Sequence, residues 1–239
     1  MMLHLGSIHV YPVKSLGGFA VSEARTTDRG LEHDRRWMLV DGNGRFLSQR
    51  EVPTMACLHT APEDTGFGVR DLRDGSGIAI PWSVTTGEAM PVQIWGDVVE
   101  VIAAAPTQNQ WFSKRLGLSC TLVYMPDHSP RPTNPAYARA FTSLSDAFPY
   151  LFISHASLAD LNTRLTPLPM DRFRPNLVVH GGTPYQEDSW RGVRVGTCLF
   201  ELVKPCARCA ITTIDQHTGQ RSAEPLATLA GYRKRMVDK

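Results

Sequence analysis

The composition excludes several broad classes of protein before any motif is considered. The 239 residues are 42% hydrophobic and 20% charged, so the chain can bury a substantial core, and we expect two domains rather than one. A net charge of +2 gives no general attraction to nucleic acid or to an anionic membrane. No segment approaches the ~20 apolar residues that cross a bilayer, and the N-terminus lacks a secretory pattern. Five cysteines, an odd number, indicate free thiols and a cytoplasmic location.

Short strands separated by turns dominate the first half of the chain. The residues from Ser7 to Lys14 predict a strand that ends before the glycine-containing turn at residues 15–18, which places Lys14 at a strand end. Two hairpins are also predicted, because Gly, Asn and Asp at a turn tolerate positive φ. Their strands lie at residues 36–40 with 45–48, around the turn 41–44, and at residues 92–95 with 98–101, around Gly96-Asp97.

Only three helices are predicted, and the second half of the chain is otherwise strands and loops. Residues 107–116 read as a helix that stops at Gly117. Residues 157–165 carry leucines at helical spacing, which indicates a face packed on a core. The third helix is bracketed by Pro225 and Gly231. Further strands are predicted at residues 177–180 and 197–203, and a proline-rich loop at 126–135.

The segment from Val203 to Asp215 contains the most informative motif. Cys206 and Cys209 are separated by two residues, and the positive charge of Arg208 between them stabilises a thiolate. The β-branched run at residues 211–214 predicts an extended chain, which disfavours a thioredoxin-type redox pair because that pair requires a helix after the first cysteine. The motif therefore needs another explanation.

Three such explanations stay open on the residues alone. A structural zinc site needs about four ligands, but Cys57, Cys120, Cys198 and the histidines show no second paired spacing. Two reduced cysteines packed in a core are the ordinary structural alternative. The third is a single thiolate bound to a soft transition metal, with the second thiol nearby.

Several motifs, in a fixed order along the chain, resemble those of MOSC-domain proteins. They are Tyr11-Pro12-Val13-Lys14-Ser15, Asp34-Arg35-Arg36-Trp37, Phe173-Arg174-Pro175-Asn176, Tyr185-Gln186-Glu187-Asp188-Ser189-Trp190, and Cys206-Ala207-Arg208-Cys209 followed by Thr212-Thr213-Ile214-Asp215. The resemblance covers nearly the whole chain and is strongest to the mitochondrial amidoxime reducing component and its bacterial relatives. It implies a β-rich α+β fold with few short helices. A smaller β-barrel-like N-terminal domain would occupy residues 1–120, and a MOSC-type β-barrel, short at its C-terminal end, residues 121–239.

The resemblance also implies a molybdenum cofactor, in which a pterin dithiolene holds the metal and one protein cysteine completes its coordination. Cys209 matches this metal ligand, the catalytic position, and Cys206 matches a neighbour that is not a ligand. The residues that match cofactor-binding positions are Lys14, Ser15, Arg35, Arg174, Asn176 and Arg208. Their chemistry suits a pterin phosphate and the polar edge of a pterin ring.

Each of these residues also has an ordinary structural interpretation. Without the resemblance, Lys14 and Arg35 would be explained more simply as solvated charges at strand ends. Ser15 could be a loop hydroxyl and Asn176 a turn residue. The family match favours the pocket over these interpretations.

The activity that the resemblance implies is reduction of small N-hydroxylated or N-oxide compounds by two electrons. Iron–sulfur spacing of the Cys-x4-Cys-x2-Cys type is absent, so the electrons would come from a separate ferredoxin-, flavodoxin- or cytochrome-type protein. The alternative is a molybdenum cofactor or sulfur carrier that uses a Cys209 persulfide and has no reductase activity. Sulfurating relatives join the domain to a pyridoxal-phosphate desulfurase, so pyridoxal phosphate is only a domain-level association here. An interaction module that has lost its metal is disfavoured by the intact cysteine and basic positions.

Overall fold

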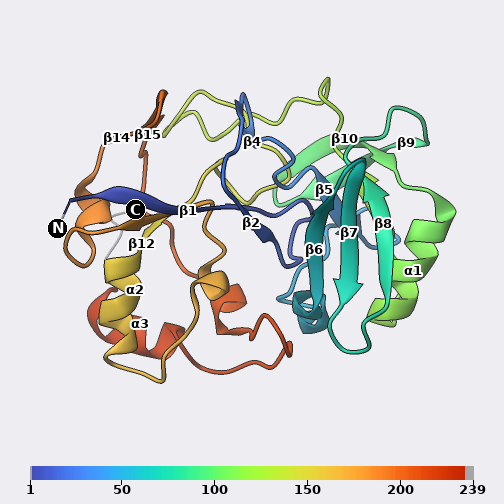
Figure 1. Cartoon of the computed structure of the whole chain (residues 1–239). Helices are drawn as coiled ribbons and strands as arrows, with labels where there is room; N and C mark the ends of the chain where they lie inside the picture. Colours follow the sequence, from blue (N-terminus) through green and yellow to red (C-terminus); the bar gives the residue numbers. More distant parts are fainter. Residues whose placement is uncertain (1, 235–239) are drawn as a thin grey trace.

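The computed structural model describes residues 2–234 as two β-rich lobes with three α-helices among the described residues (Figure 1). The helices are α1 (Pro106–Leu116), α2 (His155–Asn162) and α3 (Leu226–Tyr232). The 3₁₀ helices are η1 (Pro53–Cys57), η2 (Met170–Phe173), η3 (Gln186–Ser189) and η4 (Ala210–Thr213). The strands are β1 (His4–Val10), β2 (Phe19–Val21), β3 (Thr26–Thr27), β4 (Gly30–Leu31), β5 (Trp37–Val40), β6 (Leu58–Glu63), β7 (Gly66–Asp71), β8 (Gly77–Pro81), β9 (Ala89–Ile94), β10 (Asp97–Ala103), β11 (Thr121–Tyr124), β12 (Phe152–Ser154), β13 (Leu177–His180), β14 (Gly192–Val195) and β15 (Cys198–Glu201).

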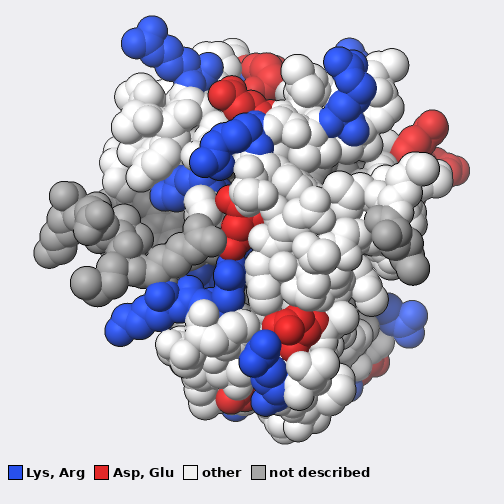
Figure 2. All heavy atoms as spheres, turned by 90° about the vertical axis from the view of Figure 1, so that its left-hand side faces the viewer, with Lys and Arg blue, Asp and Glu red and all other residues white. Residues whose placement is uncertain are grey.

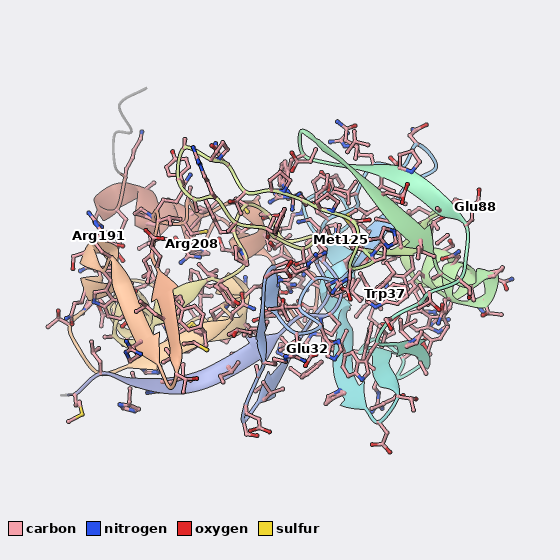
Figure 3. The ribbon with its side chains drawn as sticks, turned by 90° about the horizontal axis from the view of Figure 1, so that it is seen from above. Glu32, Trp37, Glu88, Met125, Arg191 and Arg208 are labelled. Atoms are coloured by element: carbon pink, nitrogen blue, oxygen red, sulfur yellow. The ribbon has the colours of Figure 1, made fainter. Side chains whose placement is uncertain are left out.

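The first lobe is built around a sheet that is buried on both faces. Its strand order is β5-β11-β10-β9, and the three-stranded sheet β6-β7-β8 lies beside it. Side chains of a strand alternate between faces, so Trp37 and Leu39 pack with Phe67 in one core while Met38 and Val40 pack in a second. Trp37 is accordingly seen inside this lobe in Figure 3. Burial on both faces explains why β5 is a continuous apolar run.

Helix α1 closes one end of the first core. Its Phe112 is fully buried there, and Pro106 occupies the first turn, where its missing N–H costs nothing. Gly117 ends the helix in a left-handed conformation, with φ of 69°. The helix predicted at residues 107–116 is therefore confirmed to within one residue.

The second lobe contains a sheet of order β12-β13-β1-β2, so the N-terminal strand belongs to it. Strand β1 pairs with β13 in antiparallel orientation, whereas β12 pairs with β13 in parallel. Helix α2 packs Leu158 and Leu161 against Ile153 and Phe173 to form a separate small core. None of the described helices is both long and apolar enough to cross a bilayer.

Two strands do not follow the predicted division at residue 120, because each lies in the lobe formed mainly by the other half of the sequence. Strand β1 lies in the sheet of the second lobe, and β11 pairs with β5 and β10 in the first. The two-domain division at 1–120 and 121–239 stays a prediction. Its outermost residues, Met1 and 235–239, lie outside the described residues. The two lobes thus share strands from both halves of the sequence.

The prediction of a β-rich α+β chain with few short helices is confirmed, as are the β9–β10 hairpin and the loop at residues 126–135. Two strand predictions need correction. Strand β1 ends at Val10, not at Lys14, because Pro12 has no amide hydrogen and its carbonyl accepts from the Trp37 amide instead. Residues 45–48 form no strand and make two isolated bridges, from Phe46 to Val40 and from Arg45 to Gln93.

The prediction of an extended chain at residues 211–214 is wrong. Residues Ala210–Thr213 form η4, although three of its four residues are β-branched. The reason is local hydrogen bonding, since the carbonyl of Cys209 accepts from both the amide and the hydroxyl of Thr212. Helix α2 likewise begins earlier than predicted, because Ser154 caps it by accepting from the amide of Ala156.

Replacing Phe67 with alanine tests the importance of the first core. Phe67 is fully buried and contacts Trp37 at 6.5 Å between ring centroids, so we expect Phe67→Ala to lower the free energy of unfolding by ~3–5 kcal/mol. Val98→Ala is the control because Val98 is 73% exposed, and we expect a change within ~0.5 kcal/mol. Urea unfolding measures both; equal effects of the two substitutions would contradict the assigned core.

Candidate functional site

The candidate site lies where turns from both lobes meet. The residues predicted from sequence come from the segment after β1, the turn before β5, the η2–β13 junction and the segment that precedes η4. Figure 3 shows Arg208 on the side of the second lobe and Trp37 and Met125 inside the first. On the outer face of the second lobe, basic and acidic side chains are interspersed (Figure 2). Neither basic nor acidic side chains therefore predominate on that face.

A buried carboxylate, Asp34, organises the first part of the site. One of its oxygens accepts from the backbone amide of Tyr11 at 2.9 Å, and the other accepts from Arg35 Nη1 at 2.5 Å. Burial raises the pKa of Asp34, and the positive charge of Arg35 opposes this. Arg35 also donates to Asn176 Oδ1 at 3.0 Å and to the carbonyl of Arg174 at 3.2 Å. Three of the predicted residues are thus held together by one carboxylate.

The amide of Asn176 is fully used inside the protein. Its oxygen also accepts from the Leu151 amide at 3.3 Å, and its nitrogen donates to the carbonyl of His9 at 3.1 Å. Asn176 is only 2% exposed. It therefore fixes the position of Arg35 relative to β1, and its direct contact with a pterin stays a prediction.

Arg174 is a buried cation without a carboxylate partner among residues 2–234. It is 9% exposed, donates through Nη1 to the carbonyl of Leu16 at 2.5 Å, and makes no ion pair within 4.0 Å in that range. Its guanidinium and that of Arg35 stack on the ring of Tyr11, at 4.4 and 4.3 Å from the centroid. Burial and the nearby Arg35 lower the pKa of Arg174 to about 10. A buried charge of this kind is costly unless an anion binds beside it.

A second network connects Lys14 to the thiol of Cys209. Lys14 Nζ lies 2.5 Å from Asp146 Oδ1, and Asp146 Oδ2 lies 3.5 Å from Arg50 Nη2. The same nitrogen of Arg50 donates to Cys209 Sγ at 3.4 Å. Asp146 occupies one donor of the Lys14 ammonium and leaves two without a partner among the described residues. The thiol and the lysine thus belong to one electrostatic unit.

The titration of this unit follows from its geometry. Burial opposes ionisation of Asp146, but Lys14 and Arg50 outweigh it and hold the pKa of Asp146 well below its usual range. Burial lowers the pKa of Lys14, and Asp146 opposes that effect. Asp146 is therefore charged at neutral pH, and its negative charge favours the protonated form of Lys14.

Arg50 and Asp146 were missed by sequence reasoning. Arg50 follows a predicted strand in an ordinary polar turn, and Asp146 lies in an irregular loop with no pattern of its own. Neither position carries a signal in the sequence, because Asp146 lies 96 residues from Arg50 and 132 residues from Lys14. Only the tertiary structure identifies them.

The remaining predicted residues lie around these two networks. Ser15 is buried with φ of 67°, its carbonyl accepts from Gln49 Nε2 at 2.8 Å, and its hydroxyl has no partner in the described part of the chain. Arg208 is half-buried with its guanidinium 5.4 Å from the ring centroid of Phe173. Cys206 is exposed, and among the described residues its thiol makes one hydrogen bond, to the neighbouring carbonyl of Ala207. Its side chain therefore has no structural partner comparable to that of Cys209.

A buried glutamine pair joins the cysteine segment to the first lobe. Gln49 Nε2 donates to Gln216 Oε1 at 2.9 Å, and Gln216 Nε2 returns a hydrogen bond to Gln49 Oε1 at 3.0 Å. Both side chains are at most 3% exposed. Because Gln49 also binds the Ser15 carbonyl, the pair fixes the residues after Cys209 relative to the loop that carries Lys14.

Backbone strain concentrates at the site. Six described non-glycine residues have positive φ, and four of them are Ser15, Arg35, Arg174 and Trp95. Such conformations persist only where the surrounding structure enforces them, and they cluster at functional sites. The surrounding structure therefore holds these backbone conformations, which the local sequence alone does not favour.

These observations decide between the interpretations of the cysteine motif. Cys206 is exposed and Cys209 half-buried, so the pair is not packed in a core. Within residues 2–234, no group of three His, Cys, Asp or Glu could hold a metal ion, which leaves structural zinc without ligands. The four cationic side chains Lys14, Arg35, Arg50 and Arg174 exceed the two carboxyl groups of Asp34 and Asp146, which gives a formal charge of +2 when all six are ionised. A single accessible thiol beside several cationic side chains suits a cofactor that carries a phosphate and that itself supplies most of the ligands of its metal.

Comparison with known proteins agrees with this chemistry. The MOSC N-terminal beta barrel domain family matches residues 2–119, and the MOSC domain family matches residues 141–238. Mitochondrial amidoxime-reducing component 1 of Mus musculus is 32% identical, over 96% of this chain and 71% of its own length. The same component of Homo sapiens is 33% identical, over 96% of this chain and 72% of its own length.

A second group of relatives is much longer than this chain. The molybdenum cofactor sulfurase of Oryza sativa subsp. japonica is 35% identical over 98% of this chain. The match spans only 31% of the sulfurase. The likeness therefore concerns about a third of that protein.

Asp146→Asn should weaken the dependence of stability on pH in acid. The pKa of Asp146 lies below its unfolded value of 3.8, so its charge contributes stability that is present above about pH 4 and is lost as the pH falls further. We expect the variant to be less stable than the wild type at pH 6, with the difference shrinking as the pH falls from 4 to 2.5. Thermal unfolding across this range measures it, with the exposed Asp64→Asn as control. A difference that stays constant with pH would refute the Lys14–Asp146 pair.

Added phosphate should stabilise the cofactor-free protein through Arg174. An anion that binds only the folded state at ten times its dissociation constant stabilises that state by about 1.4 kcal/mol. We expect phosphate at constant ionic strength to raise the melting temperature of the wild type and of Arg194→Gln, whose side chain is exposed, but not of Arg174→Gln. Equal shifts in all three proteins would show that phosphate acts through the bulk solvent and not at this site.

Proposed function

Because the chain belongs to the MOSC-domain family, we propose that it binds a molybdenum cofactor and reduces small N-hydroxylated or N-oxide compounds. The reduction of an N–OH group consumes two electrons and two protons and yields N–H and water. The observation that carries the proposal is the buried Arg174, which has no ion-pair partner among residues 2–234, beside a cationic network that ends at the thiol of Cys209. An anionic cofactor would neutralise the charge of Arg174, and the thiol of Cys209 would ligate its metal.

In this proposal the cationic and polar side chains divide the work of holding the cofactor. Arg174 and Lys14 have free N–H donors and are placed to bind phosphate oxygens, while Arg35 and Asn176 fix the position of Arg174 through its carbonyl and the β1 backbone. The Ser15 hydroxyl has no partner and supplies a further donor. Arg208 lies on the neighbouring side of the site, where it adds positive charge next to the ligand.

Cys209 is the proposed metal ligand and catalytic position, and Arg50 supports it. The N–H of Arg50 donates to Cys209 Sγ at 3.4 Å and so holds the sulfur in position. Asp146 holds Arg50 from the opposite side and so limits its rotation. When bound, the cofactor supplies the two-electron redox chemistry that no side chain of the described residues provides.

The electrons are proposed to come from a separate ferredoxin-, flavodoxin- or cytochrome-type protein, in the cytoplasm. Two relatives carry the name amidoxime-reducing component, and the word component supports the need for a partner. The proposal requires no nucleic acid and no membrane, in agreement with the small net charge.

A sulfur-carrier function is the second candidate, favoured by the 35% identity with a molybdenum cofactor sulfurase. In that function the Cys209 thiolate attacks the outer sulfur of a donor persulfide, forms Cys209–S–SH and releases the donor thiol. Arg50 would hold the attacking sulfur in the same way. The two functions share Cys209 but differ in whether metal stays bound.

Metal and pterin content per chain distinguishes the two functions. After expression in a host that makes the cofactor, we expect nearly one molybdenum and one pterin per wild-type chain. Cys209→Ser should lose the metal, because a hydroxyl is a poor ligand for this soft metal chemistry, whereas Cys206→Ser, the matched control, should retain it. Elemental analysis and pterin fluorescence measure the contents, and circular dichroism confirms folding.

Two results would contradict the reductase proposal. One is well-folded wild type without metal or pterin, which with a Cys209 persulfide detected by mass spectrometry would support the sulfur carrier. The other is equal loss of metal in Cys206→Ser and Cys209→Ser, which would remove the distinction between the two cysteines on which the ligand assignment depends.

A further inference from the structure

We propose that a pocket between the two lobes, outside the candidate cofactor site, binds a small flat organic cation such as an aromatic guanidinium. This interlobe pocket is lined by Val10, Phe19, Glu23, Glu32, His33 and Trp82, among others. None of the residues assigned to the cofactor lines it, so the proposal does not depend on the reductase function. In Figure 3, Glu32 lies between the lobes and apart from Arg208.

The interlobe pocket is built by both lobes. Strands β1 and β2 of the second lobe contribute Val10 and Phe19, and the segment after β8 of the first lobe contributes Trp82. Trp82 in turn packs against the first core. The volume of the pocket is about 520 Å³, which lies within the range of pockets that hold small ligands. Its walls are therefore parts of the folded sheets and of the core.

Two stacked rings give the pocket a flat surface. The imidazole of His33 stacks on the indole of Trp82, with 4.1 Å between the ring centroids and 20° between the planes. Trp82 is supported from within by the fully buried Phe67, at 5.4 Å between centroids. Both His33 and Trp82 are only half-buried, so ring surface stays available to a planar ligand. The ring nitrogens of His33 make no hydrogen bond within residues 2–234, which leaves them able to bind a ligand N–H.

The turn that carries His33 is held in an uncommon conformation. His33 and Arg35 have φ of 66° and 48°, and the buried Asp34 lies between them. Two hydrogen bonds fix this turn to the segment after β1, because the amide of Tyr11 donates to Asp34 and the amide of Arg35 donates to the carbonyl of Tyr11 at 2.8 Å. Arg35 contacts Asn176 in the candidate cofactor site, whereas His33 contacts Trp82. The surrounding structure therefore enforces the position of His33 in the pocket.

The charged side chains of the pocket favour a cation. Its lining contains two carboxylates, Glu23 and Glu32, against one guanidinium, that of Arg25. Arg25 lies 3.9 Å from Glu32, whereas Glu23 makes no ion pair within 4.0 Å in the described part of the chain. Burial lowers the pKa of His33, so its imidazole adds no positive charge at neutral pH.

One further cation acts on this part of the pocket. The charge of Arg36 reaches His33, but Arg36 is paired with Asp127 at 2.8 Å. The carboxylate of Glu23 is therefore the group available to a positively charged ligand, and the ring surface beside it selects a flat one.

Calorimetric titration of phenylguanidinium, phenylurea and benzoate into the full chain tests this selection. The three compounds combine a phenyl ring with a flat polar group and are positive, neutral and negative at pH 7. Because exposed ion pairs contribute modestly to binding, we expect phenylguanidinium to bind roughly fivefold more tightly than phenylurea, and benzoate to bind more weakly than either.

Two variants show whether binding occurs in the interlobe pocket. Glu23→Gln removes the carboxylate at nearly constant size and should weaken phenylguanidinium roughly threefold, with phenylurea unchanged. His33→Asn removes the ring but keeps a residue that tolerates positive φ, and it should weaken both compounds roughly fivefold. Glu88→Gln is the matched control, because Glu88 is exposed at the far end of the first lobe (Figure 3). Thermal unfolding confirms that each variant folds.

Cys209→Ser should bind phenylguanidinium as the wild type does, because Cys209 does not line the pocket. Weaker binding in Glu23→Gln and His33→Asn, with unchanged binding in Glu88→Gln, would support the proposal. Absence of binding to the wild type, equal affinity for the three compounds, or equal affinity in all variants would overturn it. These titrations involve no turnover, so a failure of the reductase proposal would leave their outcome unaffected.

Discussion

The burial of several cationic side chains in one region is the constraint on which the rest of this structure depends. Lys14, Arg35 and Arg174 are each buried or nearly so, and water therefore cannot solvate their charges fully. The protein compensates Arg35 with Asp34 and Lys14 with Asp146, but among residues 2–234 the guanidinium of Arg174 contacts a carbonyl oxygen and the ring of Tyr11 and makes no ion pair. An anion that bound beside Arg174 would therefore stabilise the folded chain.

Keeping this arrangement rigid requires both lobes, which explains the topology of the chain. Strand β1 lies in the sheet of the second lobe and leads directly into the segment that carries Lys14 and Ser15. The Gln49–Gln216 pair then joins that segment to the residues that follow Cys209. The anion site and the thiol are consequently fixed relative to one another by buried hydrogen bonds, which cost more to break than exposed ones. Separating the lobes would expose both halves of the site.

The regular parts of this fold could be predicted from sequence because their signals are local. Helix α1 has proline at its start, a buried aromatic and a glycine at its end, and the β9–β10 hairpin alternates apolar and polar residues. The prediction failed at residues 211–214, where β-branched side chains favoured a strand but the Thr212 hydroxyl satisfied the Cys209 carbonyl and closed a 3₁₀ turn. Strand propensity describes a residue in an average environment. In this segment, which follows Cys209, local hydrogen bonds constrain the backbone instead.

The candidate site could be predicted only in part from the sequence, because tertiary contacts define several of its residues. Motifs indicated Lys14, Arg35 and Cys209, because their order along the chain is characteristic of a family. They could not indicate Arg50 or Asp146, whose importance arises from contacts between residues far apart in the sequence. The motif residues thus define what the site can bind. The residues found only in the structure, Arg50 and Asp146, connect the ammonium of Lys14 to the thiol of Cys209 and so define the surroundings of the sulfur.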